Sequence, residues 1–153
     1  MKNPINNSVF DSRDLIEYKD ELAEDLLNSY NEFMQELHDN DEELGEWEDV
    51  EDVDDLKNAE FESVYQTEIE EFTEVKNFCD ELENYGDFTY GEVIICEDYW
   101  EEYCEEMCKD CGYLSDKLPS FISNNIDWEG VANELSVDYI TATYEGKCYY
   151  MRT

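Results

Sequence analysis

The sequence predicts a helix-dominated α+β protein, in which a long acidic α-hairpin precedes a small α+β unit that ends in a β-hairpin. Residues 12–37 and 54–83 repeat apolar side chains at helical spacing. Residues 139–152 form two strand-like runs on either side of Glu145–Gly146, which is typical of a hairpin. The chain has a formal net charge of −35, yet it is 41% hydrophobic and 14% aromatic. It therefore has the apolar content for a core.

The first helix is expected from Ser12 to about Leu37, and either Asp11 or Ser12 is suited to cap it. His38, the only histidine, would lie at its C-terminus, where a positive charge suits the helix dipole. Its buried face is predicted to contain Leu15, Leu22, Leu26, Tyr30, Phe33 and Leu37. Its opposite face supplies the first candidate binding residues, Asp14, Glu17, Asp20, Glu21, Glu24 and Asp25.

Residues 39–55 are expected to form a connection, with at most a short helical turn around Trp47. Eleven of these seventeen residues are acidic and none is basic. A calcium loop is disfavoured: a start at Asp39 puts Gly45 at position seven, and a start at Asn40 puts Leu44 at a ligand position. The candidate binding residues here are Glu42, Glu43, Glu48, Asp49, Glu51 and Asp52.

A second helix is expected from about Asp54 to Glu83. Its buried stripe is predicted to contain Leu56, Phe61, Tyr65, Ile69, Phe72, Val75, Cys79 and Leu82. Its outer face adds the last candidate binding residues, Glu68, Glu70, Glu71 and Glu74.

The remainder is predicted to hold a short strand or extended segment over residues 88–96, a helix capped by Asp98 and ended by Gly112, and a helix capped by Asp127. The C-terminal hairpin follows. The sequence thus predicts an acidic helical hairpin over residues 1–84 and a small α+β unit over 85–153, with one continuous domain left open as the alternative.

Three cysteines, Cys104, Cys108 and Cys111, have the spacing of a radical-SAM iron–sulfur motif. Such enzymes need a larger barrel than 153 residues supply. This spacing also follows one face of a helix, so we expect core packing, with zinc or a cluster as the alternative. The sequence contains no phosphate-binding loop, nucleophile elbow or second histidine. We therefore expect no catalytic residues, metal or cofactor, and a protein that is not an enzyme.

The distribution of charge predicts the class of partner. Residues 1–84 carry 29 acidic and five basic side chains, whereas residues 85–153 carry 15 and four. This charge opposes binding to nucleic acid or to anionic membranes, and leaves basic proteins as partners. Along a hairpin of about 40 Å, the 29 carboxylates give about one charge per 1.4 Å, near the ~1.7 Å of duplex DNA.

No apolar run is long enough for a transmembrane helix, and the N-terminus lacks the apolar region of a secretory signal, so a cytoplasmic location is expected.

Two stretches carry a resemblance, YGDFTYGEVIICEDYWEEYCEEMCKDCGYL and NNIDWEGVANELSVDYITATYEGKCYYMR. They resemble acidic ArdA-type antirestriction proteins of phages and mobile elements over about residues 85–153, most of all in IDWEGVANELSVDY. The long acidic hairpin departs from the multi-domain ArdA layout. The resemblance implies a small anti-defence protein that imitates DNA in the cytoplasm of a bacterial host.

Together, the charge and the resemblance predict a DNA mimic that occupies the DNA-binding groove of a restriction–modification or CRISPR nuclease. The alternatives are an acidic chaperone or antitoxin-like binder of a basic protein, and adaptation to high salt. Both a monomer and a homodimer are compatible with the sequence.

Overall fold

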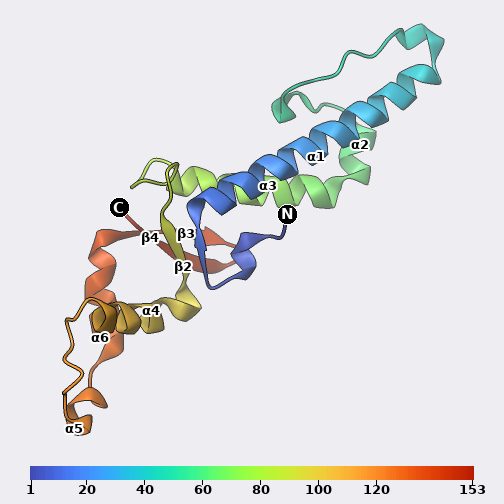
Figure 1. The fold of residues 1–153 in the computed structure, drawn as a ribbon. Helices are drawn as coiled ribbons and strands as arrows, with labels where there is room; N and C mark the ends of the chain where they lie inside the picture. The colour runs from blue at the N-terminus through green and yellow to red at the C-terminus, as the bar shows by residue number, and fades with distance from the viewer. The chain divides into compact units, whose positions relative to one another are not determined.

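A computed structural model describes all 153 residues (Figure 1) and is helix-dominated, with one four-stranded antiparallel sheet. The predicted α+β class, the long first helix and the C-terminal β-hairpin are confirmed. The helices are α1 (Ser12–Asp39), α2 (Ala59–Val64), α3 (Gln66–Leu82), α4 (Glu97–Asp110), α5 (Ser120–Ser123) and α6 (Trp128–Leu135). The strands are β1 (Val9–Asp11), β2 (Val93–Cys96), β3 (Tyr139–Tyr144) and β4 (Lys147–Arg152).

The chain forms two compact units. The first unit contains residues 1–2 and 17–77, and the second contains residues 3–16 and 78–153. Helices α1 and α3 each begin in one unit and end in the other. The predicted division at residue 84 stays a prediction.

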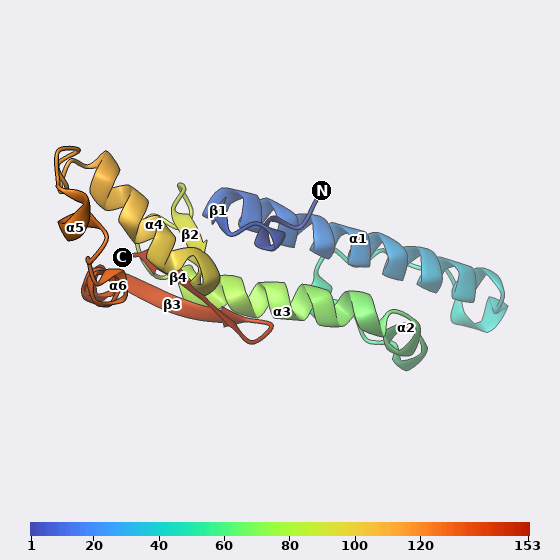
Figure 2. The ribbon, with the colours of Figure 1, turned by 90° about the horizontal axis from the view of Figure 1, so that it is seen from below.

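In the first unit, α1 and α3 lie side by side, and α2 precedes α3 (Figure 2). The core here buries Leu26, Tyr30 and Met34 of α1 and Phe61 of α2, and the partly buried Ile69 and Phe72 of α3 pack against them. The Phe61 ring meets Tyr30 edge-on at 5.1 Å between centroids and stacks on Tyr65 at 4.4 Å. Aromatic pairs of this kind add about 0.5–1.5 kcal/mol each beyond the area they bury, so Phe61 anchors this core.

The single second helix predicted over residues 54–83 is wrong, because the structure divides it into α2 and α3. The Asn58 side chain caps α2 by accepting a hydrogen bond from the Phe61 amide at 3.0 Å. Tyr65 leaves the helical conformation between the two helices. Ser63, Val64 and Thr67 flank this break, and their helix propensities are lower than those of the neighbouring glutamates.

The short helical turn that the sequence allowed around Trp47 does not form. Short 3-10 turns lie on either side of it instead, at Glu42–Leu44 and Val53–Asp55. Trp47 packs on two aromatic side chains: its ring centroid lies 5.8 Å from that of Tyr30 and 5.2 Å from that of His38.

In the second unit, the sheet has the strand order β1-β2-β4-β3, and every neighbouring pair is antiparallel. Glu145 and Gly146 join β3 to β4 with φ values of 47° and 78°. A two-residue type I′ turn requires positive φ at both positions. The strand β1 was not predicted, because three residues are too few to show alternation. Helix α4 packs against β2, β4 and α6.

The second core contains the buried residues Ile95, Trp100, Cys104 and Ala132. The Trp100 ring stacks on Tyr150 with centroids 4.3 Å apart and an interplanar angle of 6°.

Two boundaries in this unit correct the predictions. Of the strand or extended segment expected over residues 88–96, only Val93–Cys96 form a strand, since residues 88–90 lie in turns. Asp98 lies in the first turn of α4 and does not cap it. Asp127 caps α6 as predicted, because its carboxylate accepts a hydrogen bond from the Gly130 amide at 3.0 Å.

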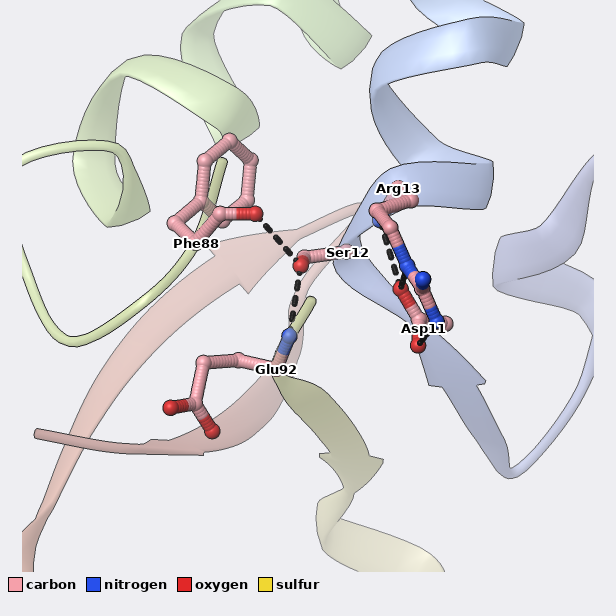
Figure 3. A network of polar contacts seen from close by, with 5 residues as sticks. All are labelled: Asp11, Ser12, Arg13, Phe88 and Glu92. Carbon is pink, nitrogen blue, oxygen red and sulfur yellow. Dashed lines mark hydrogen bonds and ion pairs between the residues drawn. The ribbon is translucent and has the colours of Figure 1, made fainter. Parts of the chain in front are cut away.

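Ser12 ties the start of α1 to a segment about 80 residues further along the chain (Figure 3). Its fully buried hydroxyl donates to the Phe88 carbonyl at 2.6 Å and accepts from the Glu92 amide at 2.8 Å. The cap itself comes from Asp11, which accepts a hydrogen bond from the Arg13 amide at 2.8 Å and pairs with the Arg13 guanidinium. That guanidinium lowers the pKa of Asp11.

Strand β3 forms one edge of the sheet. At this edge, the Thr143 amide donates a hydrogen bond of 3.0 Å to the Glu81 carboxylate on α3. An edge amide that would otherwise be open therefore has a partner within the chain.

Candidate functional site

The carboxylates form the candidate functional site, because they lie at the surface throughout the chain. No Asp or Glu is buried: 39 of the 44 are exposed and five are half-buried. Even if every Lys and Arg paired with one of them, 35 would remain without a Lys or Arg partner. The molecule therefore presents a surface that repels anions and attracts cations.

The charge is denser in the first unit. This unit carries 24 carboxylates and four Lys, a net charge of −20, whereas the longer second unit carries a net charge of −15. Fifteen of the sixteen predicted binding residues belong to the first unit, and Asp14 belongs to the second.

Fourteen of the sixteen predicted binding residues are exposed, and Glu21 and Glu71 are half-buried. Glu21 pairs with the N-terminal ammonium group at 2.8 Å and raises the pKa of that amine. Glu71 accepts a hydrogen bond from the Tyr18 hydroxyl. Exposed Asp20 and Glu70 also have partners, Lys19 and Gln66, but only Glu21 and Glu71 combine a partner with partial burial, so these two are the least accessible to a partner protein.

The first part of the acidic surface lies along α1. The helical period directs Asp14, Glu17, Glu24 and Asp25 to solvent while Leu26 and Tyr30 enter the core. Exposed like charges four residues apart on a helix, such as Asp20 and Glu24, cost a few tenths of a kcal/mol per pair. The helix forms because its apolar face is buried, not because of its surface charges.

Asn31 of α1 makes three hydrogen bonds to the acidic segment between α1 and α2. Its amide nitrogen donates to the Val50 carbonyl at 3.0 Å, and its oxygen accepts from the Val50 amide at 2.9 Å and from the Trp47 indole at 3.3 Å. The His38 ring adds a contact of 3.2 Å to the Gly45 carbonyl. The carboxylates of residues 46–52 are therefore held near α1.

Sequence reasoning missed Asn31. The only available signal was that Asn31 is an amide residue among the acidic residues on the solvent face of α1.

These contacts create an acidic groove of about 580 Å³, bordered by α1 and the connecting segment. Its lining includes the carboxylates of Glu32, Glu36, Asp39 and Asp49 and three amide side chains. Only Asp49 was among the predicted binding residues. The structure thus brings Asp49 together with three carboxylates of α1, whereas the other predicted residues are spread over the surface.

Cys104, Cys108 and Cys111 differ in their exposure. Cys104 and Cys108 are buried, and Cys111 is exposed at the end of α4. Burial raises the pKa of Cys104 to about 11, so this thiol is protonated at neutral pH. No group of three or more His, Cys, Asp or Glu side chains in the structure is placed to hold a metal ion.

None of the helices combines the length and the apolar character needed to span a membrane. A comparison of the chain with protein-family models, curated proteins and solved structures finds no match.

Proposed function

We propose that this protein is a DNA mimic that binds a DNA-binding host-defence protein, either a restriction–modification enzyme or a CRISPR nuclease, and occupies its DNA groove. The observation that carries the proposal is the density of exposed, uncompensated carboxylates in the first unit, 24 acidic residues against four lysines. The ArdA-like pattern of residues 85–153 supports the same class.

In this proposal, the carboxylates replace phosphates, and the Lys and Arg side chains that hold the DNA backbone bind them. Charge-assisted hydrogen bonds to carboxylates are roughly twice as strong as neutral ones. The net charge also attracts a basic groove from a distance and speeds association. Because both ligands use the same groove, the mimic and the duplex exclude each other.

The test is displacement of a fluorescent DNA duplex from a purified restriction–modification enzyme and from a purified Cas9-type effector. The protein is expected to displace the duplex from at least one of them, with an affinity that falls steeply as salt increases. Replacing Glu42, Glu43, Glu48 and Glu51 by Gln should weaken displacement and reduce the salt slope by about one for each ion pair that the change removes.

The matched control replaces four exposed glutamates of the second unit, Glu101, Glu102, Glu129 and Glu134, by Gln. It removes the same charge, so an equal effect in both variants would indicate that total charge, and not the first unit, determines binding. A ternary complex of nuclease, duplex and this protein would refute mimicry. Equal binding to basic proteins that have no DNA groove would favour the acidic-chaperone function instead.

A further inference from the structure

The first unit contains a second cavity, which differs in character from the acidic groove. Its volume is about 280 Å³, which at liquid density would hold about nine water molecules. This volume lies just below the range of about 300–1,000 Å³ of sites for drug-sized ligands, so the cavity has room for one long side chain. It lies between α1, the 3-10 turn Val53–Asp55, α2 and α3.

One part of the lining is apolar. Leu26, Val53, Leu56, Ile69 and Phe72 all face this cavity, and all belong to or pack on the core of the first unit. Leu56, Ile69 and Phe72 are only half-buried, so the core is not closed over them. Aliphatic stems of arginine and lysine pack on surfaces of this kind while their charged ends stay in contact with water or acceptors.

Another part of the lining is charged. Asp54, from the 3-10 turn, and Glu62, from α2, both line the cavity and are exposed. Lys76 of α3 lines it too, so the charged lining contains two carboxylates and one ammonium group. Carboxylate oxygens match the planar donors of a guanidinium group, which binds them in pairs.

We propose that this cavity receives one arginine side chain of a protein partner, with its stem on Leu56, Ile69 and Phe72 and its guanidinium at Asp54 and Glu62. The proposal rests on the proposed function, because the partner is the basic protein described there. It adds one defined anchor point to an attraction that is otherwise spread over many charges. Arginine is enriched among the few interface residues that carry most of the binding energy.

The test uses N-acetyl-arginine methylamide as the probe, titrated into the full-length protein and followed by two-dimensional NMR of the backbone amides. We expect saturable shifts at residues 54–56, 62 and 69–73. Guanidinium chloride, which has the charge without the stem, and N-acetyl-norleucine methylamide, which has a stem without the charge, should each bind more weakly. The lysine analogue should bind between these two and arginine, because it lacks the paired donors.

Two pairs of variants separate the cavity from general charge. Replacing Asp54 by Asn and Glu62 by Gln should weaken probe binding by about fivefold or more, from the range measured for exposed ion pairs. The control, Asp55→Asn with Glu60→Gln, changes the same two elements by the same charge outside the cavity and should leave binding within about twofold.

A second pair of variants leaves the charge unchanged. Thr73→Phe places an aromatic ring at the cavity and should block the probe, whereas Thr67→Phe on the same helix, outside the cavity, should not.

Shifts spread over the acidic surface without saturation, or equal effects in the charge variant and its control, would overturn the arginine site. Displacement of DNA from a nuclease does not depend on this titration. If the probe does not bind but the protein displaces DNA, the arginine site is refuted and the DNA-mimic function stands. If the probe binds but the protein displaces no DNA, the arginine site stands and the DNA-mimic function is refuted.

Discussion

At the scale of single residues, Ser12 joins two distant parts of the second unit through one hydroxyl. It is the only buried polar residue of the chain, and both of its side-chain hydrogen bonds reach residues more than 70 positions away. Sequence reasoning considered Ser12 only as a cap for α1, because local patterns carry no information on a partner so far along the chain.

Replacing Ser12 by Ala should lower the free energy of unfolding by about 1–3 kcal/mol, because the Phe88 carbonyl and the Glu92 amide would both lose a buried partner. Urea unfolding followed by circular dichroism measures this change. Ser8→Ala is the control, since the Ser8 side chain is exposed. Equal stabilities of the two variants would show that the Ser12 hydroxyl does not hold these segments together.

Cys104 provides a prediction for the thiols. At pH 8, iodoacetamide should modify Cys111 quickly and Cys104 only after unfolding, because Cys104 is fully buried and its pKa is raised to about 11. Mass spectrometry of peptides from a timed reaction distinguishes the two sites. Rapid labelling of Cys104 in the native protein would contradict its place in the core.

The raised pKa of Cys104 also predicts how the stability of the protein depends on pH. An unfolded chain releases the Cys104 proton near pH 9, whereas the raised pKa of the folded protein holds it until about pH 11. The contribution of Cys104 to stability is therefore complete below pH 9 and decreases as pH rises from about 9 to 11. A Cys104→Ala variant should lack this part of the alkaline decline in a series of unfolding curves.

At the scale of elements, the sequence predicts best where apolar residues repeat. The buried face of α1 and the hairpin of β3 and β4 were found because each pattern spans several periods. The break at Tyr65 was missed because Phe61, Tyr65 and Ile69 keep a spacing of four residues through it. The stacking of Tyr65 on Phe61 is a packing effect that spacing does not reveal.

The candidate binding residues also show that sequence patterns do not reveal tertiary contacts. Their exposure followed from residue type, and all sixteen candidates lie at least partly at the surface. Which of them share the acidic groove did not follow, since Asp49 reaches α1 through the contacts of Asn31 with Val50 and Trp47.

The connecting segment gives the prediction at this scale. Asn31→Ala should release residues 46–52 from α1, because it removes three hydrogen bonds at once. Hydrogen exchange should accelerate at the Val50 amide, and Trp47 fluorescence should shift to longer wavelength as its ring becomes wetter. Asn28→Ala is the control, one helical turn away and exposed. Unchanged exchange in Asn31→Ala would mean that aromatic packing alone holds the segment.

At the scale of the whole molecule, the net charge of −35 opposes folding. Added sodium chloride should raise the melting temperature, since the screening length falls from about 30 Å at 0.01 M to about 3 Å at 1 M salt. Each kcal/mol of relieved repulsion corresponds to about 2–4 °C in a chain of this size. Differential scanning calorimetry across this range measures the effect, and a melting temperature that falls with salt would count against a crowded acidic surface.

The bond between Glu81 and Thr143 has a consequence for handling the purified protein. At the sequence pI of about 4.1 the net negative charge is gone, so it no longer keeps the β3 edges of different molecules apart. Wherever the bond between Glu81 and Thr143 opens, the edge can then pair with another chain. The material that precipitates at that pH is expected to contain intermolecular β-structure, which infrared spectroscopy would detect, so storage at neutral pH should keep preparations clear.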